Sequence, residues 1–260
     1  MAGMFLLAVI SSFGVVATRL LLGICVLAFS QSTNTAFVQA EPFTKTETAA
    51  TKYDSIEKYK KMQVSGWQLI VHQDLVENEP KLWEQVKQEL EHQFYQIHRR
   101  VPASAVKKLK GVSIWVELNE GHHAGLVYHP NRNWLINHDM HPDKARCVEV
   151  ANAQNFLKWS IAQPFAVLHE MAHAWHDQHL PGGHGNSELA ILHQRVKQKE
   201  LYGQVLHINQ KLRPAYARTN PMEYFAESTE AFFGTNDFYP FVRSELNQYD
   251  PEMHDLLVRV

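Results

Sequence analysis

The stretch VLHEMAH at residues 167–173 places His169 and His173 four positions apart, with Glu170 directly after the first histidine. Residues four apart share one face of an α-helix, so both imidazoles can reach a single Zn²⁺ at about 2.0–2.1 Å. Glu170 then points toward the open coordination position, where a zinc-bound water would sit. The stretch therefore predicts a zinc site on a helix, and Pro164 stands where that helix begins.

Such a site needs a third protein ligand, and one candidate is His179, ten residues after His169. That spacing is the metzincin spacing, which requires a helix break at a glycine seven residues after the first histidine. Position 176 is instead a histidine, and the residues after it are compatible with helix. In a continuous helix His179 would lie about 9 Å along the axis from His173, too far to share the ion. The metzincin alternative is therefore disfavoured.

The stronger candidate is a later helix, whose sequence from residue 216 to 227 is YARTNPMEYFAE. Pro221 suits the first turn and Asn220 suits the N-cap. Glu223 and Glu227 are four apart, so one carboxylate can bind the metal while the other accepts a hydrogen bond from a ligand imidazole. A solvated acidic face is the alternative, because Glu230 follows. The aromatic residues of this segment leave little exposed surface, however, and a buried carboxylate needs a partner.

The two motifs together resemble the catalytic domain of anthrax lethal factor and its relatives, within the glutamate-liganded (gluzincin) zinc metallopeptidases. The resemblance covers residues 164–233. It implies one zinc ion per chain and the following roles: metal ligands His169, His173 and Glu223, general base Glu170, transition-state residue Tyr216, and Glu227 as the carboxylate behind the ligands. The implied reaction is peptide-bond hydrolysis by a zinc-bound water that Glu170 activates, with Tyr216 and the metal stabilising the oxyanion.

The rest of the chain predicts an α+β protein of the zincin-like type. Strands are expected at 64–71, 112–118, 126–128 and 147–150, with an amphipathic helix at 79–99. Helices are then expected at 165–178, 187–205, 221–233, 238–249 and 251–258. The expected architecture is a small N-terminal mixed sheet with helices, the active-site helix, and a mainly helical C-terminal lobe. By resemblance, residues 147–152 are expected to form the edge strand beside the cleft.

The first 40 residues are predicted to lie outside this fold. Residues 4–29 are apolar or small apart from Arg19, and small residues at Val38 and Ala40 suit a signal-peptidase site. The prediction is export to the periplasm or medium. The alternative is a retained membrane anchor with the domain outside the cytoplasm, because residues 4–29 are long enough to span a bilayer. Residues 41–63 are expected to be a loose polar leader, and residues 64–260 the metallopeptidase domain.

The amino-acid composition of the chain argues against some classes of function and favours others. The formal charge is −2, from 25 basic and 27 acidic residues, so no basic excess points to a nucleic-acid partner. The two cysteines cannot form a cysteine-rich zinc module. The 16 histidines favour metal or proton chemistry. Most of the remaining ones are expected to be loop residues, including the crowded set His122, His123, His129, His138 and His141. His184 is expected to be exposed. His176, one turn beyond the two ligand histidines on the same face, is expected to lie either behind the metal ligands or in solvent.

A peptide or protein substrate is thus the expected partner. Two other classes stay open at this stage: a catalytically silent zinc-binding protein that keeps the fold, and a zinc hydrolase of a non-peptide amide. The presence of both Glu170 and Tyr216 disfavours the silent protein. An aromatic-rich cleft with few charges would favour peptide side chains over other amides.

Overall fold

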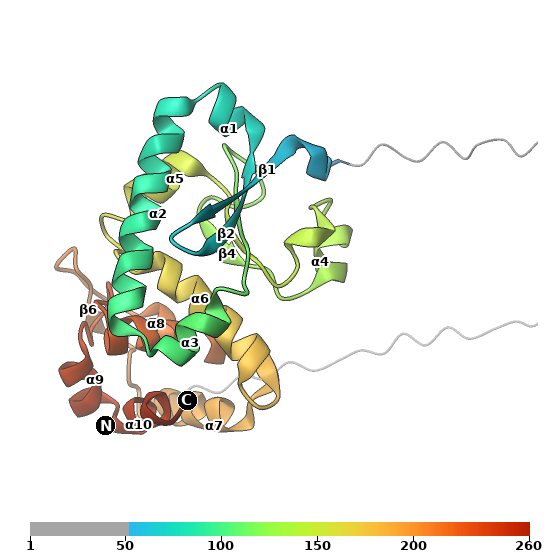
Figure 1. Ribbon diagram of the computed structural model, residues 1–260. Helices are drawn as coiled ribbons and strands as arrows, with labels where there is room; N and C mark the ends of the chain where they lie inside the picture. The colour runs from blue at the N-terminus through green and yellow to red at the C-terminus, as the bar shows by residue number, and fades with distance from the viewer. Residues whose placement is uncertain (1–51) are drawn as a thin grey trace, which may run out of the picture. The chain divides into compact units, whose positions relative to one another are not determined.

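The computed structural model describes residues 52–260, so the predicted signal peptide or anchor and residues 41–51 lie outside the described residues. The described part is α+β, as predicted, and is built on a five-stranded mixed sheet (Figure 1). Along the sheet the strand order is β1-β2-β3-β5-β4. The three inner strands run parallel, and each edge strand is antiparallel to its neighbour. The strands are β1 (Tyr59–Val64), β2 (Trp67–His72), β3 (Ile114–Val116), β4 (Leu126–Tyr128) and β5 (Val148–Val150).

The sheet begins earlier than the sequence predicted. The single strand expected at 64–71 is the second arm of a hairpin, and β1 lies within the expected leader. Ser65 and Gly66 both have positive φ, 51° and 84°, which is the backbone of a two-residue type I′ turn. The leader prediction was therefore wrong for residues 59–63. Strand β1 is a polar edge strand with exposed Lys60 and Lys61, a composition that hides the strand pattern.

The long helix α2 (Pro80–Arg100) covers the sheet and was predicted within one residue at each end. Its apolar side packs on the sheet, and the ring of Phe94 stacks on Trp67 at 4.4 Å between centroids. Both side chains are completely buried. The shorter helices in this half are α1 (Gln73–Glu77), α3 (Ala103–Leu109), α4 (Arg132–Asn137) and α5 (Ala153–Trp159).

Helix α6 (Ala166–His179) carries the HExxH motif and separates two hydrophobic cores. Val167, Leu168 and Met171 belong to the core beneath the sheet. Ala172 belongs to the second core, which is built with α8 (Pro221–Phe233) and the other C-terminal helices. These are α7 (Ser187–Gln198), α9 (Arg243–Tyr249) and α10 (Pro251–Arg259), and Figure 1 shows them gathered on one side of α6. The motif helix is thus central to the described domain.

Three predicted elements differ from the structure in their extent. The helix expected at 187–205 ends at Gln198, and the chain then forms a small hairpin of β6 (Val205–Leu206) and β7 (Leu212–Arg213). The helix expected at 238–249 begins only at Arg243. The strand expected at 112–118 is paired over three residues. Among residues 52–260, no helix is both long and apolar enough to cross a membrane.

Candidate metal centre

The first turn of α6 is anchored from outside the helix. Its first N–H groups have no partner within the helix, and the Val167 N–H donates instead to Gln93 Oε1 at 2.9 Å. Gln93 is a buried side chain on α2. From this fixed start, His169 and His173 project from one face, with their ring centroids 4.8 Å apart. The predicted pairing of the two imidazoles is confirmed in the structure.

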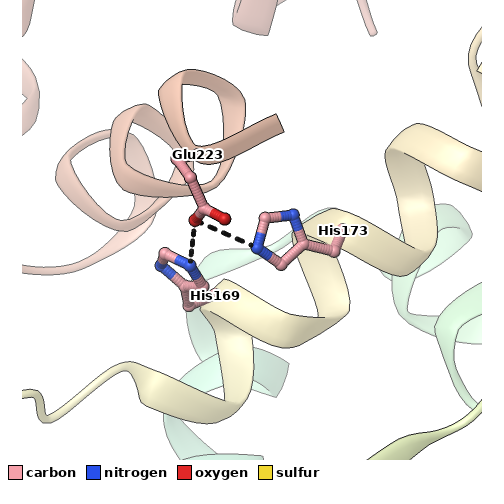
Figure 2. Close-up of side chains that lie close together, drawn as sticks. All are labelled: His169, His173 and Glu223. Carbon is pink, nitrogen blue, oxygen red and sulfur yellow. Dashed lines mark hydrogen bonds and ion pairs between the residues drawn. The ribbon is translucent and has the colours of Figure 1, made fainter. Parts of the chain in front are cut away.

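Helix α8 begins as the sequence predicted. Pro221 occupies the first position, and the Asn220 side chain accepts hydrogen bonds from the N–H groups of Met222 and Glu223. This cap starts the helix so that Glu223 faces α6 (Figure 2). Glu223 Oε2 lies 3.1 Å from Nε2 of His169 and 3.3 Å from Nε2 of His173. The three side chains assigned as ligands therefore converge.

These three residues fit a tetrahedral zinc ion. Two ligands at 2.0–2.1 Å from such an ion are about 3.3 Å apart, and the two distances from Glu223 match this value. All three ligand atoms lie within 4.8 Å of one another. Two neutral imidazole nitrogens and one carboxylate are also a donor set typical of a catalytic zinc centre. The residues lining the surrounding cavity include three glutamates but no lysine or arginine, so the centre favours a cation.

The carboxylate behind the ligands is Glu230, which corrects the assignment of Glu227. His169 Nδ1 lies 2.7 Å from Glu230 Oε1. Such a contact fixes the tautomer and leaves Nε2 free for a metal. Glu227 is buried nearby, but its carboxylate accepts a hydrogen bond from Asn236 Nδ2 at 3.2 Å. Glu230 is only 3% exposed, so it is not the solvated residue that the sequence allowed.

The electrostatics of the cluster follow from these contacts. Burial raises the pKa of Glu223, but the adjacent imidazoles of His169 and His173 outweigh it and lower the pKa to about 2. Burial lowers the pKa of His169, but contacts with Glu223 and Glu230 raise it well above its usual value. The pKa of Glu230 is raised to about 7 by burial, against the effect of His169. Without a metal, Glu223 is therefore a carboxylate and His169 keeps a proton, which zinc binding would have to displace.

Glu170 and Tyr216 line the same cavity, which has a volume of about 400 Å³. Glu170 Oε2 accepts a hydrogen bond from the backbone N–H of Tyr128 at 2.7 Å. Tyr216 lies in a 3-10 turn (Tyr216–Arg218) just before α8 and is half exposed. Burial is the main cause that raises its pKa, so the phenol stays protonated and can donate a hydrogen bond.

The strand beside the cavity is β4, not the segment 147–152. Strand β5 lies inside the sheet between β3 and β4, so it has no free edge. Strand β4 is the edge strand, and all three of its residues line the cavity. The remaining walls are mostly apolar and are formed by Pro130, Phe156, Trp159, Ala166 and Met222.

The three other histidines on or just after α6 lie in different environments. His179 is the last residue of an unbroken α6, and in the described chain it belongs to no group of potential metal ligands. This confirms the expectation that the helix continues. His176, however, is fully buried, and burial lowers its pKa to about 4. His184 lines the cavity instead of facing solvent. Burial therefore excludes the solvated alternative for His176, and the exposed position expected for His184 was wrong.

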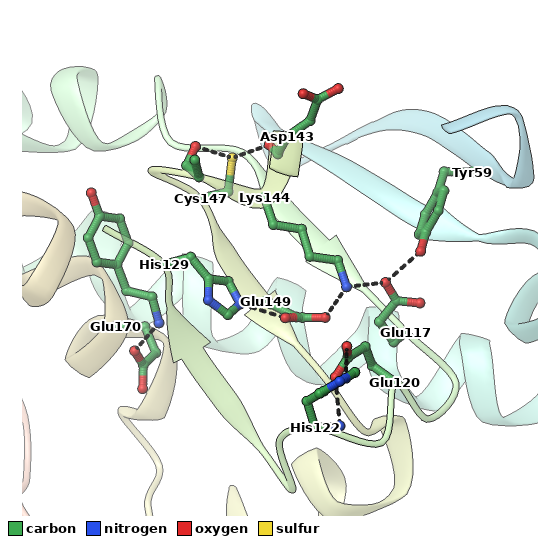
Figure 3. Close-up of polar contacts among 12 residues, drawn as sticks. Tyr59, Glu117, Glu120, His122, His129, Asp143, Lys144, Cys147, Glu149 and Glu170 are labelled. Atoms are coloured by element: carbon green, nitrogen blue, oxygen red, sulfur yellow. Dashed lines mark hydrogen bonds and ion pairs between the residues drawn. The ribbon is translucent and has the colours of Figure 1, made fainter. Parts of the chain in front are cut away.

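A buried polar network lies on the face of the sheet opposite α2, and no pattern in the sequence indicated it (Figure 3). Lys144 is only 2% exposed and pairs with both Glu117 and Glu149. Tyr59 donates a hydrogen bond to Glu117 at 2.9 Å, and His129 Nε2 lies 2.6 Å from Glu149. His129 is thus a buried residue, contrary to its expected place in a loop; His141 is buried as well. A lysine and two glutamates at these positions carry no pattern that distinguishes them from surface residues.

Comparison with known proteins identifies no relative: no protein-family model, no curated protein and no solved structure matches this chain.

Proposed function

We propose that the protein is a zinc-dependent endopeptidase of the gluzincin type, with a zincin-like fold. One observation carries the proposal: His169, His173 and Glu223 converge with the spacing of zinc ligands, on the wall of a cavity that Glu170 and Tyr216 also line. A small mixed sheet, followed by the HExxH helix and a helical C-terminal part, agrees with the proposed fold.

In this proposal, His169, His173 and Glu223 hold one Zn²⁺ per chain. When bound, the ion would lower the pKa of a coordinated water toward 7 and polarise a carbonyl oxygen. Glu170 accepts the proton of the attacking water and later delivers it to the leaving amine. The Tyr216 hydroxyl donates a hydrogen bond to the oxyanion as charge develops. Glu230 holds the ring of His169 in its tautomer.

The cavity favours a peptide over other amides. Apart from the proposed metal centre, Gln163 and His184, the lining is apolar or aromatic, which suits peptide side chains. The cavity also adjoins the edge strand β4, and an extended peptide can add as a further strand along the part of this edge that Glu170 does not occupy. We further propose that the protein acts outside the cytoplasm, because residues 1–40 have the pattern of an export signal or anchor.

The proposal is tested by cleavage of a quenched-fluorescence peptide library by the zinc-loaded protein. Cleavage that is lost with a chelator and restored with zinc supports it. Glu170→Gln should bind zinc normally and lose turnover. Normal cleavage by Glu170→Gln would remove Glu170 as the base. A zinc-loaded protein that cleaves no peptide would favour the catalytically silent alternative.

A further inference from the structure

Tyr128 connects the edge strand β4 to the motif helix α6 at two points. Its backbone N–H donates to Glu170 Oε2 at 2.7 Å. Its hydroxyl donates to Asp177 Oδ2 at 2.7 Å and accepts a hydrogen bond from Gln178 Nε2 at 2.9 Å. Glu170 and Asp177 are seven residues apart, so they lie two turns apart on the same face of α6. Tyr128 is 5% exposed, so this bridge is shielded from water.

The backbone N–H of Tyr128 points away from the sheet. In an antiparallel pair, alternate residues bond the neighbouring strand. The Gly125 C=O accepts from Ala151, and the His129 N–H donates to Cys147, so these two residues face β5. Tyr128 lies next to His129, and backbone groups alternate in direction along the strand. The N–H of Tyr128 therefore points away from β5, toward the outer edge of the sheet. That edge N–H would otherwise bond water or an incoming peptide, but here it holds one oxygen of Glu170.

Strand β4 is also fixed on its other side. His129 directly follows Tyr128, and its ring contacts the buried Glu149. The C=O of His129 accepts a hydrogen bond from the Arg146 N–H at 2.5 Å. Because His129 is held to β5 and its flanking loop, Tyr128 cannot slide along the sheet. Figure 3 shows the contact on Glu170 and the buried network on either side of this strand.

We infer that Tyr128 is a positioning residue for the reaction: its bridge between β4 and α6 holds one oxygen of Glu170 and leaves the other free to accept a proton. The inference rests on the proposed peptidase function for its catalytic consequence. It assigns a role to the Tyr128 hydroxyl, which touches neither the metal ligands nor a reacting atom. Asp177 acts with it, since Asp177 accepts the hydrogen bond from that hydroxyl.

The kinetic test compares Tyr128→Phe with Tyr95→Phe, a change on the exposed side of α2. We expect Tyr128→Phe to lower kcat about 3- to 10-fold, the scale of one ordinary intramolecular hydrogen bond, with KM and zinc content unchanged. Tyr95→Phe should match the wild type.

Asp177→Ala should lower kcat as Tyr128→Phe does. Asp177→Asn keeps an accepting oxygen and should restore most of the lost kcat. The double variant Tyr128→Phe/Asp177→Ala should be no worse than either single one. A kcat for Tyr128→Phe equal to that of Tyr95→Phe would overturn the inference.

Hydrogen exchange tests the bridge without any substrate. The amide of Tyr128 should be protected in the wild type, and Glu170→Ala should lower its protection at least tenfold. The amide of His129, which bonds β5, should keep its protection and serves as the internal control. Equal protection of the Tyr128 amide in both proteins would overturn the inference. Because this readout needs no turnover, absence of peptidase activity would reject the proposed function and leave the bridge to be decided by exchange alone.

Discussion

His169 Nδ1 lies 2.7 Å from Glu230 Oε1, and this contact decides which carboxylate supports the proposed metal centre. Glu230 is seven residues after Glu223, two turns along α8, so both glutamates face the same ring of α6. Glu227 is one turn after Glu223 and is directed to Asn236 instead. The His169 ring is therefore held between two carboxylates of one helix.

Glu230→Gln should weaken zinc binding. Loss of a carboxylate that orients a ligand histidine typically costs about 10- to 100-fold in metal affinity. Glu227→Gln should have a smaller effect, because Glu227 accepts its hydrogen bond from Asn236. Competition with a chromophoric chelator measures both affinities. Equal losses in the two variants, or a larger loss for Glu227→Gln, would contradict the assignment of Glu230.

Glu170→Gln and Tyr216→Phe should separate the two proposed catalytic roles. Removing a general base typically lowers turnover about 10²- to 10⁴-fold. Tyr216 is half exposed and supplies one hydrogen bond, so Tyr216→Phe should cost less, about 10- to 100-fold. Steady-state kinetics with zinc content measured on the same samples checks both. A larger loss for Tyr216→Phe than for Glu170→Gln would reverse the assignment.

Gly125→Ala should impair substrate binding through Trp159. A Cβ added at Gly125 would overlap the Trp159 ring, which lines the cavity. Trp159 is 43% exposed and can move outward, so the loss of stability should stay near 1 kcal/mol while KM rises several-fold. Gly185→Ala is the control, because nothing lies within 4 Å of its added Cβ. An unchanged KM in Gly125→Ala would show that Trp159 does not contact substrate.

Lys144→Met should destabilise the domain strongly. The change leaves the carboxylates of Glu117 and Glu149 buried without their cation, at a cost of about 3–5 kcal/mol. Lys60→Met is the matched control: it breaks an exposed pair with Glu77, and should cost about 1 kcal/mol or less. Urea unfolding of the metal-free proteins gives both values. Similar costs for the two variants would mean that the network is not buried in solution.

The sequence predicted the parts of the site that local signals determine. Asn220 and Pro221 start α8 at the expected residue, and the four-residue spacing of His169 and His173 pairs their rings. The choice between Glu227 and Glu230 could not be made from the sequence, because it depends on how α8 is rotated against α6. The only available signal for Glu230 was its seven-residue spacing from Glu223.

Long-range pairing explains the other errors. Strand β4 is the edge strand because it folds back antiparallel on β5, and nothing within residues 126–128 specifies that order. The burial of Lys144 likewise depends on two residues far apart in the sequence. Glu117 directly follows β3, and Glu149 lies on β5. The hairpin turn at Ser65 and Gly66 was the one local signal that could have identified β1.

Zinc stoichiometry, measured by elemental analysis, is the sharpest test of the proposed metal centre. It is measured on protein without a histidine tag, for the wild type, Glu223→Ala and His179→Ala. We expect one zinc per chain in the wild type, loss of zinc in Glu223→Ala, and full zinc in His179→Ala. Wild-type protein that binds no zinc after reconstitution, or zinc that is lost with His179 and kept without Glu223, would contradict the proposed metal centre.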